Sequence, residues 1–78
     1  MTQFPHITAN PAILGGKPCL KDTRISVELI MEWIASGATP DTIVAKFPHL
    51  NRDAVQEAIL YAAAFVRNEI FIEVKLAA

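Results

Sequence analysis

The chain has 78 residues, enough for one domain (residues 1–78) with a small core. Hydrophobic residues make up 53% of it and the mean hydropathy is +0.33, more apolar material than a lone domain of this size easily buries. The longest uncharged run outside the termini, residues 58–66, is far shorter than the roughly 20 residues of a membrane span. With no secretory leader recognisable, we expect a cytoplasmic protein whose surplus apolar surface meets a protein partner and no membrane.

The net charge of −1 is unevenly distributed. Residues 1–27 carry Lys17, Lys21 and Arg24 against Asp22, whereas residues 28–78 carry four basic residues against seven acidic ones. Any contact with nucleic acid is therefore expected to depend on the N-terminal third of the chain.

Residues 7–27 are expected to form a β and turn segment, because prolines and glycines interrupt any helix there. Short strands are predicted at residues 7–8 and 20–27. Between them, Gly15-Gly16-Lys17-Pro18 lacks the Ser or Thr that follows the lysine of a phosphate loop. We interpret these glycines as a tight turn with positive φ.

Three helices are predicted over residues 27–68. The first follows Ser26 as N-cap and runs over residues 27–36, and the second has Thr39 as its cap and Pro40 at its first position. The third starts after Asn51 and runs to about residue 68. Its expected core positions are Val55, Ala58, Ile59, Ala62, Phe65 and Val66.

The last residues, 70–78, alternate between apolar and other side chains, which predicts a strand-like, partner-binding tail. Such a strand has no obvious place in a three-helix core. It is expected to pair with the N-terminal strands, with a second copy or with the sheet edge of a partner.

The second helix, a short turn and the third helix match the helix-turn-helix pattern, although many protein-only bundles share it. In the DNA-binding interpretation, Arg52 and Gln56 reach base edges while Lys17, Lys21 and Arg24 hold phosphates. In the alternative, these are ordinary surface charges.

The chemistry-bearing side chains do not assemble into a catalytic or metal-binding pattern. Cys19 is interpreted as a small apolar core residue, His49 as part of a turn, and Glu28 and Glu32 as a solvated face without a basic partner. We expect no enzyme activity and no cofactor.

Residues 14–27, LGGKPCLKDTRISV, closely resemble the signature of the domain of unknown function 433 family. The resemblance continues through residues 35–40, 47–50 and 55–62, and covers roughly residues 7–69. It implies a mainly α fold, a three-helix homeodomain-like helix-turn-helix bundle preceded by a short β segment. It also implies an antitoxin of the VapB kind that blocks a PIN-like ribonuclease toxin with its C-terminal segment and represses its own promoter.

Together these expectations describe a homodimeric antitoxin that binds its toxin and, through the basic residues above, operator DNA. Arg67 or Lys75 is expected to suit an acidic ribonuclease site. The alternative is a homodimeric interaction or scaffold domain without DNA binding. The expected toxin or dimer interface consists of Trp33, Leu60, Ala63, Ala64, Arg67, Ile70, Phe71, Ile72, Val74 and Leu76.

Overall fold

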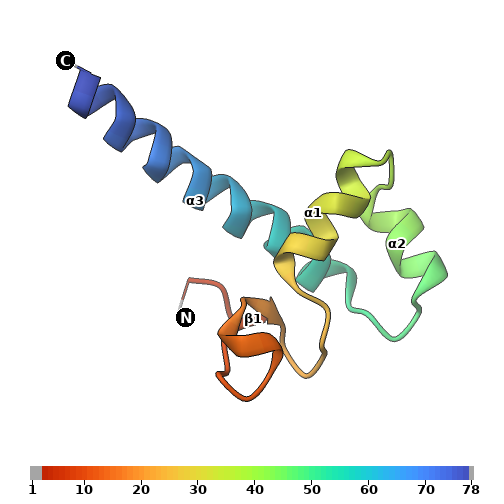
Figure 1. The fold of residues 1–78 in the computed structure, drawn as a ribbon. Coiled ribbons are helices and arrows are strands. Elements are labelled where there is room, and N and C mark those ends of the chain that lie inside the picture. Colours follow the sequence, from red (N-terminus) through yellow and green to blue (C-terminus); the bar gives the residue numbers. More distant parts are fainter. Residues whose placement is uncertain (1–2, 78) are drawn as a thin grey trace.

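The computed structural model describes residues 3–77, with side chains described for residues 3–67. The chain is mainly helical, as predicted, with a short two-stranded antiparallel segment at its N-terminal end (Figure 1). The elements are β1 (Ile7–Thr8), the 3₁₀ helix η1 (Leu14–Gly16), β2 (Cys19–Leu20), α1 (Val27–Ala35), α2 (Pro40–Lys46) and α3 (Arg52–Ala77).

The N-terminal segment is a small hairpin-like layer at the base of the helices. Ile7 pairs with Leu20 and Thr8 with Cys19, and the Ile7 and Leu20 side chains are buried. The predicted glycine turn is confirmed, since Gly15 and Gly16 have φ angles of 65° and 89°. β2 is much shorter than the predicted strand over residues 20–27, because the chain turns after Leu20 and Thr23 N donates to Leu20 O.

The helix starts follow the predicted caps. Ser26 Oγ accepts a hydrogen bond from Leu29 N at 3.0 Å, and the Thr39 hydroxyl accepts one from Thr42 N at 3.2 Å. Asn51 Oδ1 accepts from Asp53 N at 2.7 Å at the start of α3. Each cap satisfies a backbone donor that the first helical turn leaves without a partner.

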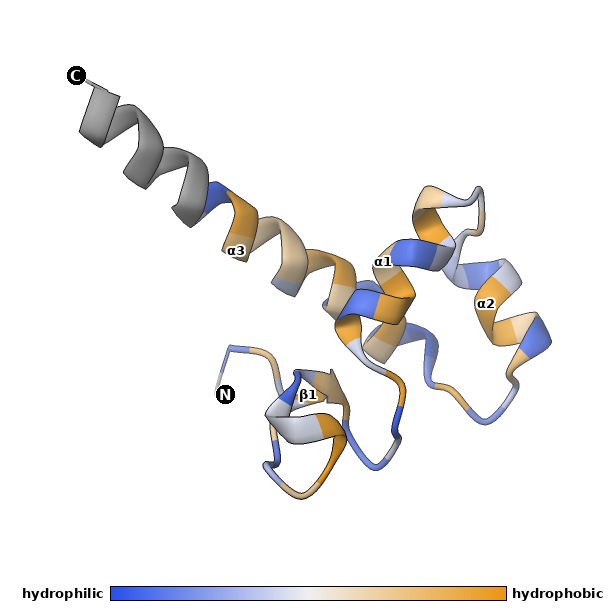
Figure 2. Cartoon of the chain, viewed as in Figure 1, coloured by the Kyte–Doolittle hydropathy of each residue, from blue (hydrophilic) through white to orange (hydrophobic). Residues whose placement is uncertain are grey.

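The core lies where α1, α2 and the β segment pack against the first half of α3. Ile30 on α1 and Val55 and Ala58 on α3 have exposed fractions of 0%. Figure 2 shows apolar residues on α1, α2 and this half of α3. A short chain therefore gains its stability from a small set of fully buried contacts.

Two predicted core residues lie outside this core. Phe65 is 58% and Val66 49% exposed, so their assignment to the buried stripe was wrong. The reason is geometric. Val27, the first residue of α1, lines the same groove as Phe65 and Val66. Because α1 has no earlier turn, it does not extend far enough to cover Phe65 and Val66.

The strand-like C-terminal tail was also a wrong prediction. α3 does not end near residue 68 but continues as one helix of 26 residues to Ala77. The stretch contains neither proline nor glycine, so nothing in it interrupts the helical hydrogen-bond ladder. The distal part of α3 points away from the other elements (Figure 1).

Candidate functional site

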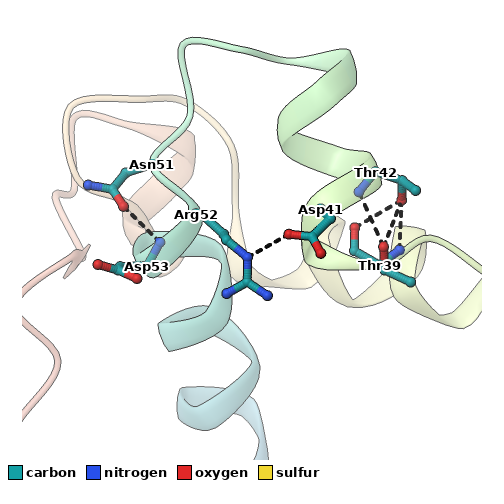
Figure 3. Close-up of polar contacts among 6 residues, drawn as sticks. All are labelled: Thr39, Asp41, Thr42, Asn51, Arg52 and Asp53. Atoms are coloured by element: carbon teal, nitrogen blue, oxygen red, sulfur yellow. Dashed lines mark hydrogen bonds and ion pairs between the residues drawn. The ribbon is translucent and has the colours of Figure 1, made fainter.

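The start of α3 carries the two residues that were expected to read bases. Arg52 Nε donates to Asp41 Oδ1 at 2.6 Å, which ties the first turn of α3 to the first turn of α2 (Figure 3). The Asp41 carboxylate raises the pKa of Arg52, mainly through this hydrogen bond. Gln56 lies one turn further along and is exposed. The ion pair thus links the two helices at the surface and partly neutralises the expected DNA contact.

Lys21 lies near the same end of α3. It lines a hollow of about 440 Å³ together with His49 and Asn51 from the α2–α3 turn and His6 from the N-terminal segment. Lys21 therefore lies at the end of the molecule where α3 starts, but the hollow is lined by Asn51 and Ala54 and by neither Arg52 nor Gln56.

Lys17 and Arg24 lie elsewhere. They line a second hollow, of about 520 Å³, beside the start of α1, together with Glu28 and Glu32. Lys17 Nζ lies 2.8 Å from Glu28 Oε1, and this hydrogen bond raises the pKa of Lys17 and lowers that of Glu28. The expectation that Glu28 has no basic partner was wrong, because a loop brings Lys17 to it across 11 residues. The five basic and polar DNA candidates are thus divided between two places.

A contact that the sequence did not indicate joins the N-terminal segment to α3. His6 N donates to Glu57 Oε2 at 2.5 Å, and His6 Nδ1 lies 3.0 Å from Glu57 Oε1. The Glu57 side chain is only 15% exposed. Because the two residues are 51 positions apart, no local pattern could have revealed the pair.

The expected partner-binding residues of α3 fall into two groups, because the structure describes side chains only as far as residue 67. Leu60 is 54% exposed, Ala63 and Arg67 are exposed, and Ala64 is half-buried. A groove of about 390 Å³ runs along the α1 side of α3, with Met31, Ala62, Phe65 and Val66 among its mostly apolar lining residues. The remaining candidates have side chains outside the described residues: Ile70, Phe71, Ile72, Val74 and Leu76.

Comparison with known protein families shows to which family the chain belongs. Residues 7–62 match the family described as "Protein of unknown function (DUF433)". The chain belongs to the DUF433 family. The uncharacterised protein y4eO of Sinorhizobium fredii is 31% identical over 58 residues, which are 74% of this chain and 26% of that protein. The chain thus spans about a quarter of the length of this relative.

A solved DUF433 structure shares the fold. The crystal structure of a DUF433 member protein from Anabaena variabilis superimposes with a TM-score of 0.71 at 23% identity, covering 99% of this chain and 73% of that one. The DUF433 match includes all five DNA candidates, whereas Ala63 and every candidate beyond it lie outside the matched residues. The DNA-binding candidates therefore lie within the part of the chain that defines the family, whereas most of the partner-binding candidates lie beyond it.

Trp33 lies apart from the α3 candidates. Its ring stacks on Phe47 at a centroid distance of 5.0 Å and an interplanar angle of 8°, where α1 meets α2. It is half-buried and packs against the core. In this DUF433 chain Trp33 thus broadens the buried face of α1.

Cys19 behaves as the small core residue that was predicted. It is 3% exposed, its Sγ donates to Lys17 O at 3.2 Å, and burial raises the pKa of the thiol. Among the residues that the structure describes, no three His, Cys, Asp or Glu side chains are grouped to hold a metal ion. In the same part of the chain, no helix combines the length and apolarity that a membrane span requires.

Proposed function

We propose that this protein is the antitoxin of a type II toxin–antitoxin pair. It binds and neutralises a PIN-like ribonuclease toxin through α3, and it represses its operon through DNA contacts at the start of the same helix. The observation that carries the proposal is that α3 continues beyond the bundle with apolar side chains exposed on it.

The first support is energetic. A helix gains most of its stability from packing an apolar face, and isolated helices shorter than about 12–15 residues are marginal in water. The distal part of α3 extends from the bundle, and Phe65 and Val66 are about half exposed where it begins. Leu60 is about half exposed one turn earlier, on the solvent side of the helix. A groove on a partner would cover such a helix in the helix-in-groove mode of recognition.

The second support is the position of Arg67. This exposed cation lies on α3 directly after Val66, next to the apolar residues that the partner would cover. A PIN-like ribonuclease has an acidic active site, and a guanidinium pairs well with carboxylates. Arg67 is therefore the residue proposed to approach that site.

The test is co-purification of the tagged chain with the product of the neighbouring reading frame, combined with rescue of growth from that product. Leu60→Asp is expected to weaken the complex at least tenfold, because it places a charge in the apolar contact. Gln56→Ala, exposed one turn earlier on α3, serves as the matched control and should leave the complex intact. Failure to recover any ribonuclease with the wild-type chain would overturn the antitoxin assignment.

A second candidate is a homodimeric interaction or scaffold domain without DNA binding. It is favoured by the ion pairs that occupy Lys17 and Arg52, and by the net charge of −1. A gel-shift titration with the DNA upstream of the gene, at low and high salt, separates the two candidates. Lack of binding at low salt, for the chain alone and for its toxin complex, would overturn the repressor half of the first proposal, and the additional failure to recover a ribonuclease would leave the scaffold.

A further inference from the structure

The hollow of about 440 Å³ beside the start of α3 combines residues from three separate parts of the sequence. His6 comes from the N-terminal segment, Lys21 from the turn after β2, and His49 and Asn51 from the α2–α3 turn. Leu20, Leu50 and Ala54 are buried and also line it, so core residues form part of its wall. Polar side chains are thus gathered around a concave surface that the core supports.

Three of these side chains can donate hydrogen bonds into the hollow. Among the described residues, Lys21 makes no ion pair, unlike Lys17 and Arg52. The His49 ring packs edge-on against Phe47 at a centroid distance of 6.3 Å, which restrains its orientation. Asn51 uses its Oδ1 as the helix cap, so its NH₂ group remains a donor. His6 Nδ1 is held by Glu57, and this ring contributes to the wall.

Among the described residues, Asp22 is the one acidic residue that lines the hollow. It follows Lys21 in the turn after β2, is exposed, and has a φ of 63°, a conformation that asparagine tolerates well. Its carboxylate therefore opposes an anion at this position, and Asp22→Asn removes that charge without changing the backbone preference of the turn.

We propose that this hollow binds a phosphate group, held by Lys21, His49 and Asn51. Amine, imidazole and amide donors on separate segments suit the oxygens of a tetrahedral anion. The source we favour is a phosphate of a nucleic-acid backbone, because the hollow lies beside the first turn of α3, where the proposed DNA contact Arg52 directly follows Asn51. That part rests on the DNA-binding half of the proposed function, whereas the phosphate site itself does not.

The experiment follows the backbone amide NMR signals of Lys21, Thr23, His49 and Asn51 during titration with inorganic phosphate and, separately, with a short DNA duplex. Lys21→Ala is expected to weaken both titrations about tenfold, and Asp22→Asn to strengthen them. For the duplex, Lys21→Ala should also reduce the slope of log K against log salt by about 0.9, the value of one phosphate contact. Lys46→Ala removes an exposed lysine at the end of α2 and is the matched control.

The outcomes separate the two proposals. Lys21-dependent shifts with inorganic phosphate but none with DNA support the site, identify a free phosphate as its ligand and remove the DNA-binding half of the proposed function. Duplex binding with a salt slope that Lys21→Ala leaves unchanged, together with no Lys21-dependent shifts with inorganic phosphate, overturns the site but leaves DNA binding in place. Weaker binding in Asp22→Asn, or no shift with either probe, overturns the phosphate site.

Discussion

At the scale of single residues, the His6–Glu57 contact is a polar interaction that ties the N-terminal segment to α3. Glu57 accepts from both the backbone and the ring of His6, and its side chain is largely removed from water. A hydrogen-bonded carboxylate in such a position contributes more than an exposed ion pair.

We therefore predict that Glu57→Ala lowers the free energy of unfolding by about 1–3 kcal/mol, since it leaves the His6 amide without its acceptor. Urea denaturation followed by circular dichroism measures the change. Gln56→Ala, on the adjacent exposed position, should change stability by less than about 0.5 kcal/mol. Equal effects of the two substitutions would show that the contact contributes nothing.

The Lys17–Glu28 pair is exposed on both sides and gives a prediction about pH. The Glu28 pKa is lowered by the hydrogen bond from Lys17, so any stabilisation by this pair is present above the ordinary pKa of a glutamate and is lost as the pH falls through the lowered value. Lys17→Ala should raise the pKa of Glu28 toward its ordinary value. NMR titration of the Glu28 carboxyl carbon measures this, with Lys46→Ala as the control that leaves it unchanged.

Sequence reasoning at this scale succeeded where partners are local. Ser26, Thr39 and Asn51 were predicted as caps because a cap bonds to a residue two or three positions away. The Lys17–Glu28 and His6–Glu57 pairs were not predicted, because both depend on how the β segment folds back on the helices. The hollow beside Lys21 was missed for the same reason, although Lys21 itself had been chosen for its charge.

At the scale of elements, α2 depends most on its ends. It has only seven residues, and Thr39 and Thr42 bond reciprocally, each hydroxyl accepting from the backbone of the other residue (Figure 3). So short a helix has few internal hydrogen bonds, and the capping contacts are a large share of its stabilisation.

Thr39→Ala is accordingly predicted to cost about 1 kcal/mol of stability, because it removes the hydroxyl that accepts from Thr42 N. Thr39→Ser keeps that hydroxyl and should stay within about 0.5 kcal/mol of the wild type. Thermal and urea unfolding compare the three proteins. If serine and alanine destabilise equally, the loss comes from the methyl group and the capping explanation is wrong.

α3 shows why periodicity alone misjudged one element. The alternation of residues 70–76 fits a strand, yet Ile72 and Leu76 also stand seven and eleven positions after Phe65, a helical spacing. A short apolar stretch is compatible with both periods. What decided between them was continuity, since the stretch follows a capped helix with no residue that ends it.

At the scale of the whole molecule, the residues of α3 that stabilise the fold are different from those that are exposed for binding. Its first half carries Val55 and Ala58 at 0% exposure, whereas Leu60, Phe65 and Val66 further along are about half exposed. The number and order of the helices could be predicted from caps and breakers. The point at which α3 leaves the core could not, because it depends on where α1 begins in space.

Ile30→Ala and Leu60→Ala test this separation, since both delete the same number of carbon atoms. Ile30 is fully buried, so its truncation should cost about 2–5 kcal/mol, whereas Leu60→Ala should cost well under half as much. If Ile30→Ala fails to fold, Ile30→Val, with an expected loss of about 0.5–1.5 kcal/mol, keeps the comparison measurable. Urea unfolding gives the values. A greater loss for Leu60→Ala would mean that α3 is covered there by a second copy.

Two of the aromatic contacts among the described residues provide the protein with built-in optical reporters. Trp33, the single tryptophan of the chain, stacks on Phe47 where α1 meets α2, whereas Tyr61 on α3, the single tyrosine, packs edge-on against Phe4 of the N-terminal segment at a centroid distance of 5.2 Å. Tryptophan emission therefore reports on the α1–α2 junction, and tyrosine absorbance on the groove that Tyr61 lines. A partner that occupies this groove should perturb the tyrosine signal and leave the tryptophan spectrum almost unchanged, so an unlabelled sample reveals which part of the surface is engaged.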